Sequence, residues 1–174
     1  QWAGRYELCA FPKGFLAAAG EDAVRQAIFQ QRPDVILHTA AISDTGYCAD
    51  HPEQAYRANV ELPVWLARAA AETGAKLVAF SSDQVDAGVE QSGPLPETIP
   101  LKPANVYGQG KLEMEQRVQA LCGQGFAVVR LERGFDHAQV GQKLTGMGIG
   151  VLRHHRMAGG LATGQVLERR GQAR

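Results

Sequence analysis

The stretch Asp34-Val-Ile-Leu-His38 is a short apolar run that follows Arg32-Pro33. Its length and its flanking residues are typical of a buried parallel strand. A second run of this kind, Lys76-Leu-Val-Ala-Phe80, comes after a helical pattern over residues 64–73. Because parallel strands need a long crossover connection, the two runs and the helix between them predict a right-handed β-α-β unit.

The same alternation extends to both sides of this unit. The sequence predicts strands over residues 6–11, 34–38, 76–80 and 127–131, and helices over residues 21–31, 64–73 and 107–121. Pro63 is expected to separate the helix over residues 64–73 from a shorter one that opens at His51-Pro52. The order predicts a doubly wound α/β fold, a parallel sheet covered on both faces, with ligands at the carboxyl ends of the strands.

The overall composition excludes several classes of protein. The 174 residues include 18 Lys and Arg against 18 Asp and Glu and are 45% hydrophobic, which fits one folded domain and no binding of nucleic acid. No stretch approaches the roughly 20 apolar residues of a membrane-spanning helix. Cys9, Cys48 and Cys122 form no C-x-x-C pair. They predict reduced thiols in a cytoplasmic protein, and no metal site.

The charge and the composition change after residue 135. Residues 1–135 carry 12 basic and 16 acidic side chains, whereas residues 136–174 carry six and two, with eight glycines and no proline or aromatic residue. A segment of this composition buries little apolar surface. We therefore expect residues 136–174 to form a loosely ordered tail rich in Gly and Arg.

Tyr107, Lys111 and Ser82 are the residues that best suit chemistry. Tyr107 and Lys111 lie at i and i+4, on one face of the predicted helix. A free phenol has a pKa near ~10, but a nearby ammonium favours the phenolate and lowers that pKa. Ser82 follows a predicted strand and can hydrogen-bond a carbonyl oxygen while the tyrosine protonates it. Each residue alone has a simpler interpretation, an exposed Tyr–Lys pair and a strand-end turn.

The residues after the strand over 34–38 suit a cofactor. Ala40 and Ala41 have side chains small enough for a flat cofactor to approach the backbone. Close packing of a helix on the sheet explains two small residues equally well. His38, at the end of this strand, is expected to be packed and hydrogen-bonded near the crevice.

Four segments carry a resemblance to a known family. They are D-V-I-L-H-T-A-A from residue 34, N-V-E-L-P from residue 59, S-S-D-Q-V from residue 81 and P-x-N-V-Y-G-Q-G-K-L-E-x-E from residue 103. In this order they resemble the extended short-chain dehydrogenase/reductase superfamily, and within it the dTDP-4-dehydrorhamnose reductases and related sugar-nucleotide-binding oxidoreductases. The resemblance covers residues 5–131, and several motifs in order are more specific than any one of them.

The resemblance implies a reaction and a role for each residue. A nicotinamide cofactor, NADPH or NADH, would reduce a keto group on a nucleotide-linked sugar. Tyr107 would be the general acid, Lys111 would bind the nicotinamide ribose and tune the tyrosine, and Ser82 would hold the substrate carbonyl. Both Tyr107 and Lys111 would contact the cofactor, the two alanines would line its path, and Asn59 would hold the architecture. The resemblance also implies a cytoplasmic enzyme that can form a homodimer.

The sequence departs from this family at both ends. The family begins with a strand and a G-x-x-G-x-x-G turn that holds the cofactor pyrophosphate, and neither precedes Tyr6. That strand would lie mid-sheet, so we expect unpaired strand edges there. The family's C-terminal substrate region has no counterpart here. We predict a partial NAD(P)-binding Rossmann domain over residues 1–135 and a tail over residues 136–174, produced by a truncated or frame-shifted reading.

Two other functions share these motifs. A nucleotide-sugar epimerase or dehydratase uses the same Ser, Tyr and Lys; dehydratases usually add acids beside the serine, and here Asp83 is followed by Gln84. A non-catalytic dinucleotide-binding regulatory subunit would need neither the phosphate-binding turn nor the substrate region. The presence of Ser82, Tyr107 and Lys111 favours an enzyme over this last possibility.

Overall fold

The computed structural model of the protein describes residues 6–11, 18, 20–90, 99–123, 125–131 and 149–154. Five strands form one sheet in the order β1 (Tyr6–Phe11), β5 (Ile149–His154), β2 (Val35–His38), β3 (Lys76–Ser82) and β4 (Phe126–Leu131). Strands β2, β3 and β4 pair in parallel, as the sequence predicts. Strand β5 runs antiparallel to both of its neighbours, β1 and β2.

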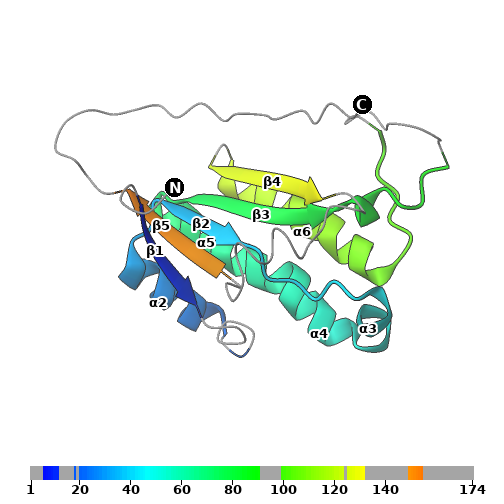
Figure 1. The fold of residues 1–174 in the computed structure, drawn as a ribbon, viewed down its shortest axis with the longest axis horizontal. Helices are drawn as coiled ribbons and strands as arrows, with labels where there is room; N and C mark the ends of the chain where they lie inside the picture. The colour runs from blue at the N-terminus through cyan, green and yellow to red at the C-terminus, as the bar shows by residue number, and fades with distance from the viewer. Residues whose placement is uncertain are drawn as a thin grey trace.

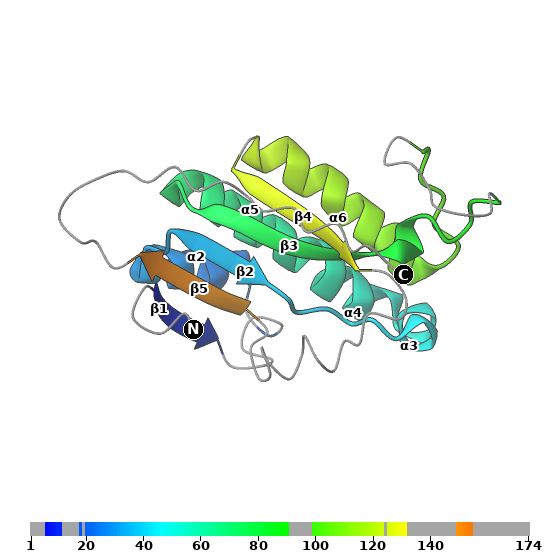
Figure 2. The same cartoon turned by 45° about the horizontal axis from the view of Figure 1, so that its top comes forward.

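The helices are α2 (Glu21–Gln31), α3 (Thr45–Asp50), α4 (Pro52–Tyr56), the π-helical turn η1 (Arg57–Glu61), α5 (Leu62–Thr73), the 3-10 turn η2 (Asp83–Val85) and α6 (Val106–Cys122). The longer helices lie on one side of this sheet, and α3 and α4 lie beyond the ends of its strands (Figures 1 and 2). Successive parallel strands progress along the sheet in one direction, and right-handed crossovers then place their helices on one side. The predicted Rossmann-like α/β arrangement is confirmed, whereas the predicted helix cover of the second face falls outside the described residues.

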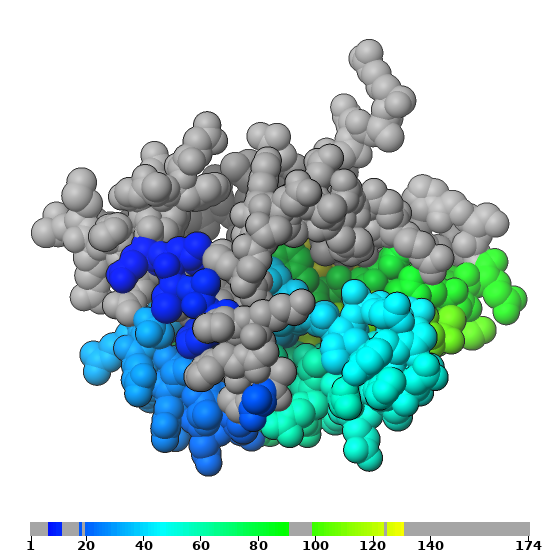
Figure 3. Space-filling model, turned by 60° about the horizontal axis from the view of Figure 1, so that its bottom comes forward, coloured from blue at the N-terminus to red at the C-terminus, as the bar shows by residue number. Residues whose placement is uncertain are grey.

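The core lies between the sheet and α2, α5 and α6. Alternate residues of each strand point to opposite faces, and in β2 and β3 the residues that face the helices are buried. These buried positions include Ile36, Leu77 and Ala79, which pack with Leu66 and Met114 of the helices. Figure 3 shows the helix-covered side, flanked by α2 in blue and by α3 and α4 in cyan. None of the described helices is long and apolar enough to span a membrane.

Strand β5 corrects two expectations. The edges of β1 and β2 that face each other are not left unpaired, because residues 149–154 lie between them and pair with both. Part of the predicted tail therefore has regular structure. The sequence does not predict this strand, because it is only six residues long and contains Gly150. The rest of the tail, residues 136–148 and 155–174, lies outside the described residues, and the domain boundary at residue 135 stays a prediction.

The helical segment around Pro63 also differs from the prediction. Helices α4 and α5 are continuous through the turn η1, and Pro63 lies in the first turn of α5 instead of separating two helices. In a regular α-helix the ring of Pro63 would collide with the carbonyl of Asn59, four residues earlier. The wider π-helical turn opens the backbone at this point and so lets the helix continue.

Candidate active site

Ser82 lies at the end of β3, where the turn η2 begins. Ser82 is the N-cap of η2, and its Oγ accepts a hydrogen bond of 3.2 Å from the backbone N–H of Gln84. The same hydroxyl donates to Oδ1 of Asp83 at 3.0 Å. These two bonds hold the Ser82 side chain at the carboxyl end of the sheet, the side where ligands bind in parallel α/β folds.

The tyrosine segment is the first turn of α6. Asn105 caps this helix, because its Oδ1 accepts a 2.8 Å hydrogen bond from the backbone N–H of Gly108. Gly108 lies so close to η2 that a Cβ at this position would overlap the carbonyl oxygen of Gln84. The close approach of the two backbones brings Tyr107 next to Ser82.

Tyr107 is 7% exposed, and its phenol lies beside the hydroxyl of Ser82. Its burial raises the pKa of the phenol above its ordinary value, while the neighbouring Ser82 hydroxyl, which can donate to the phenolate, lowers it by a smaller amount. The pKa shift that the sequence predicts has the wrong sign, since the effect of burial is larger. The Lys111 ammonium lies 5.8 Å from the centre of the Tyr107 ring and is hydrogen-bonded elsewhere. The phenol therefore stays protonated at neutral pH.

Lys111 is 2% exposed, and its Nζ donates a 3.0 Å hydrogen bond to the backbone carbonyl of Phe80. Burial lowers the pKa of its ammonium from 10.5 to about 8, although the Glu115 carboxylate opposes this shift. Among the described residues one of its three N–H donors is engaged, by Phe80, which leaves two for a ligand. Ser82, Tyr107 and Lys111 thus lie together, as their order in the sequence predicts.

Asn59 fixes the loop that follows β2. Its Nδ2 donates to the carbonyl of Ile42 at 2.8 Å, and its Oδ1 accepts from the N–H of Ile42 at 2.9 Å. The thiol of Cys48 donates to the same carbonyl at 3.3 Å. The loop so held includes Ala40, which is half-buried, and Ala41, which is exposed. The backbone at these two alanines is therefore held in place at the carboxyl end of β2.

His38 and Ser81 are buried polar residues on the helix-facing side of the sheet. Within the part of the chain that the structure describes, neither ring nitrogen of His38 nor Oγ of Ser81 has a hydrogen-bond partner. The expected hydrogen bond of His38 is thus not found. Burial, and to a smaller extent the charge of Lys111, lowers the pKa of His38 to about 3, so its imidazole is neutral at physiological pH.

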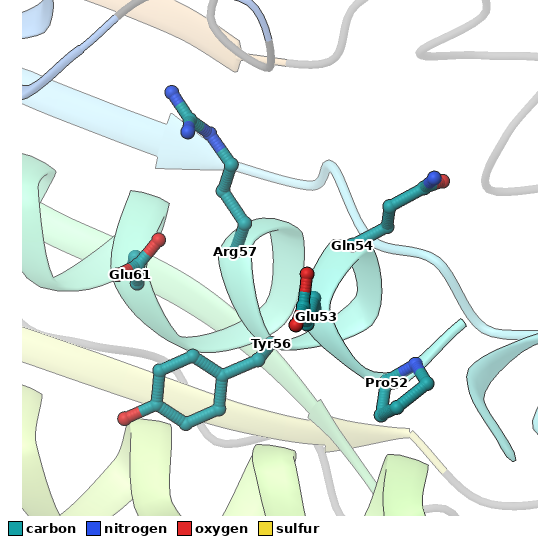
Figure 4. Close-up of a pocket in the computed structure, with 6 residues that line it drawn as sticks. All are labelled: Pro52, Glu53, Gln54, Tyr56, Arg57 and Glu61. Carbon is teal, nitrogen blue, oxygen red and sulfur yellow. The ribbon is translucent and has the colours of Figure 1, made fainter.

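Two surface hollows lie beside α4. The larger, of about 640 Å³, is lined by Pro52, Glu53, Gln54, Tyr56, Arg57 and Glu61 (Figure 4). Tyr56 points toward α6, where its hydroxyl donates to Glu113 at 2.7 Å. The smaller, of about 170 Å³, lies between α4 and α6. Neither hollow is lined by a residue that the sequence predicts to be catalytic or cofactor-binding.

Two contacts near the site have no signal in the sequence. Asn105 Nδ2 donates to Gln84 Oε1 at 2.8 Å, across 21 residues of chain. Cys48 lies in a small buried cluster with Tyr107 and Ala55. Gln84 and Asn105 lie in two of the segments that carry the family resemblance, but sequence spacing alone pairs neither these two residues nor Cys48 with Tyr107.

Comparison with known proteins places the chain in a family. Residues 3–146 match the RmlD substrate binding domain. A dTDP-4-dehydrorhamnose reductase of Salmonella typhimurium is 38% identical over 101 residues, which are 57% of this chain and 33% of that protein. The methionine adenosyltransferase 2 subunit beta of Bos taurus is 38% identical over 97 residues, which are 56% of this chain and 28% of that protein.

The fold of a solved relative agrees with this match. The crystal structure of dTDP-4-dehydrorhamnose reductase from Bacillus anthracis, in complex with NADP, superimposes with a TM-score of 0.63 at 27% identity. The match covers 75% of this chain and 47% of the relative, so the chain spans less than half the length of each of these proteins. The family model nevertheless matches most of the chain, which therefore belongs to the RmlD substrate binding domain family.

Proposed function

We propose that the chain carries the reacting end of an NADPH-dependent reductase that acts on the keto group of a nucleotide-linked sugar. The observation that supports this most directly is the contact between the phenol of Tyr107 and the hydroxyl of Ser82, with the ammonium of Lys111 behind the ring. The names of two relatives, both dTDP-4-dehydrorhamnose reductases, support the choice of reaction. The NADP complex of one of them supports the choice of cofactor.

In this proposal the chain's own residues orient the carbonyl and supply the proton. The cofactor would supply a hydride to the carbonyl carbon. Ser82 would turn its one hydrogen from Asp83 to the carbonyl oxygen, and Tyr107 would protonate that oxygen as its negative charge develops. The raised pKa of Tyr107 suits this role, because the phenol keeps its proton until the oxygen becomes basic enough to take it.

The residues present fit the nicotinamide end of the cofactor. Lys111 has two N–H donors beyond its bond to Phe80 and can hold the hydroxyls of a ribose. Ala40 and Ala41 leave the backbone after β2 accessible to a flat ring. The 174 residues contain no G-x-x-G-x-x-G turn for the pyrophosphate. The proposal therefore assigns to this chain only the nicotinamide end of the cofactor site.

The test is NADPH oxidation in the presence of dTDP-4-dehydrorhamnose, catalysed by the longest polypeptide that the gene encodes around these residues. We expect Tyr107→Phe to lower kcat by about 10²- to 10⁴-fold, the usual contribution of a general acid. The control is Tyr56→Phe, which removes an exposed hydroxyl of α4 that lies outside the proposed site. Equal turnover by the Tyr107→Phe variant and the unchanged protein would disprove the role of the phenol.

A second candidate is a binding subunit without turnover. The similarity to methionine adenosyltransferase 2 subunit beta favours this possibility. The two functions differ in one measurement: a reductase consumes NADPH stoichiometrically with sugar reduction, whereas a binding subunit retains NADPH unchanged. An epimerase, the other enzyme that shares these residues, would interconvert its sugar with no net consumption of the cofactor.

A further inference from the structure

We propose that Gln84 and Asn105 are positioning residues that set the contact between Ser82 and Tyr107 by linking the end of β3 to the first turn of α6. The part of this inference that concerns turnover rests on the proposed function. The structural part, a side-chain link that aligns two separate segments, stands on the contacts alone.

Asn105 uses both ends of its side-chain amide. Its Oδ1 accepts from the N–H of Gly108 at 2.8 Å and so caps α6, while its Nδ2 donates to Oε1 of Gln84 at 2.8 Å. A helix cap needs only the first bond. The second bond is therefore additional to the cap, and it connects α6 to η2.

Gln84 continues this link toward the serine. The side chain is 9% exposed, and its Nε2 donates to Oδ1 of Asp83 at 3.3 Å. The same oxygen accepts from Oγ of Ser82 at 3.0 Å. A continuous series of hydrogen bonds thus runs from the first turn of α6, through Asn105, Gln84 and Asp83, to the hydroxyl that contacts Tyr107.

The packing around this series leaves little room for adjustment. Gly108 is in such close contact with the backbone of Gln84 that no side chain fits between them, so the two backbones already touch. The distance that can still vary is the one between the hydroxyl oxygens of Ser82 and Tyr107. The side-chain hydrogen bonds set that distance. Small errors of this kind matter, since a displacement of about 1 Å at a reacting group costs on the order of 100-fold in rate.

Two neutral substitutions break the link on either side. Asn105→Ser keeps a hydroxyl for the helix cap, because serine is a favoured N-cap residue, but it has no amide to reach Gln84. Gln84→Met keeps the length of the side chain and removes its donor and acceptor. Neither adds a charge near Tyr107, so electrostatic side effects are avoided. The matched control is Gln116→Met, at an exposed position of α6.

The first measurement is the titration of Tyr107 by NMR of ¹³C-labelled tyrosine in the 174-residue chain, assigned with Tyr107→Phe. When Tyr107 ionises, the one hydrogen of the Ser82 hydroxyl can turn from Asp83 to the phenolate, which lowers the pKa of Tyr107. Because each single substitution moves Ser82 out of line, we expect it to raise that pKa. The double variant should show no further rise, since both changes break the same link. The control Gln116→Met should leave the titration unchanged.

The second measurement is turnover of NADPH in the longer polypeptide. We expect kcat to fall by about tenfold or more in each variant, with KM for NADPH unchanged, because misalignment affects the reaction and not cofactor binding. An unchanged pKa of Tyr107 in a folded Asn105→Ser variant would overturn the inference, as would effects that add fully in the double variant. If Tyr107→Phe retains activity, the proposed function fails, whereas the titration still tests the link.

Discussion

Lys111 is held as a cation in a place from which water is almost excluded. The residue is 2% exposed, and among the described residues the acceptor of its ammonium is the backbone carbonyl of Phe80. Burial of a charge with few hydrogen bonds to replace its water destabilises the fold. The same burial lowers the pKa of the ammonium. Such a position suits a group that acts on a ligand better than one that stabilises the protein.

The stability of the protein should therefore depend on pH through Lys111. Below pH 8 the lysine is protonated in both states, and its burial costs about 3 kcal/mol, since one pKa unit corresponds to about 1.4 kcal/mol. Between pH 8 and 10.5 the unfolded chain binds the proton and the folded chain does not, so the free energy of unfolding rises with pH. We expect Lys111→Met to abolish this rise, measured by urea denaturation across that range.

The control for this pH dependence is Lys76→Met, at an exposed lysine of β3. This variant should follow the unchanged protein at every pH, because other groups that titrate in the same range are common to both. A difference between Lys111→Met and the unchanged protein that does not vary from pH 7 to 10 would contradict the buried ammonium.

Substitution by alanine should have opposite effects on stability at two glycines of α6. At Gly108 a Cβ would overlap the backbone of Gln84, whereas at Gly110 it would make an ordinary contact with Val60. Alanine is the better helix former by roughly 1 kcal/mol. We expect Gly110→Ala to stabilise the protein by up to about that amount, and Gly108→Ala to destabilise it by about 1–3 kcal/mol, the usual effect of overpacking.

The two variants are compared by urea denaturation, and each serves as the control for the other, since both lie in α6. Gly108→Ala should also raise the pKa of Tyr107, because separation of α6 from η2 moves the phenol away from the Ser82 hydroxyl, which lowers that pKa. Equal stabilisation by both substitutions would show that the two backbones are not in contact at Gly108.

At the scale of elements, local patterns predict most of the fold. The strands over residues 6–11, 76–80 and 127–131 and the helix over residues 21–31 agree with β1, β3, β4 and α2 to within two residues, because apolar runs and helical spacing are local signals. The grouping of Ser82, Tyr107 and Lys111 follows from the order of those elements. Strand β5 could not be predicted, since its pairing with β1 depends on contacts more than 130 residues apart.

The interactions that align the site were missed for a similar reason. The bond of Asn105 to Gln84 and the clamp of Asn59 on Ile42 join residues 21 and 17 positions apart. An amide in a sequence has many possible partners, and only the fold selects one. The sign of the pKa shift at Tyr107 was predicted wrongly because sequence spacing shows the nearby lysine but not the depth of burial.

The role of β5 can be tested by one substitution in its centre. The backbone of Val151 lies opposite Cys9 of β1 on one side and Ile36 of β2 on the other. Proline has no N–H to donate and is excluded from the middle of sheets. We expect Val151→Pro to destabilise the protein by about 2 kcal/mol or more, since a lost ladder bond leaves a backbone group unsatisfied.

The matched variant for this strand is Val151→Thr, which keeps a β-branched side chain and the backbone N–H. Hydrogen exchange provides the second readout: the amides of β1 should lose protection in Val151→Pro and keep it in Val151→Thr. If β1 stays equally protected in both variants, the strand at residues 149–154 does not hold β1 in the sheet.

At the scale of the whole molecule, catalysis and cofactor affinity are separate properties. In the proposed function the described residues hold only the nicotinamide end, whereas a dinucleotide gains much of its affinity from a glycine-rich turn around the pyrophosphate. No such turn occurs in the 174 residues. We therefore expect the 174-residue chain to bind NADPH weakly or not at all, measured by titration of NADPH fluorescence. Saturation at micromolar NADPH would contradict this expectation and would require another phosphate site. A longer polypeptide with the turn should bind NADPH. Its Tyr107→Phe variant should still bind NADPH but lose turnover.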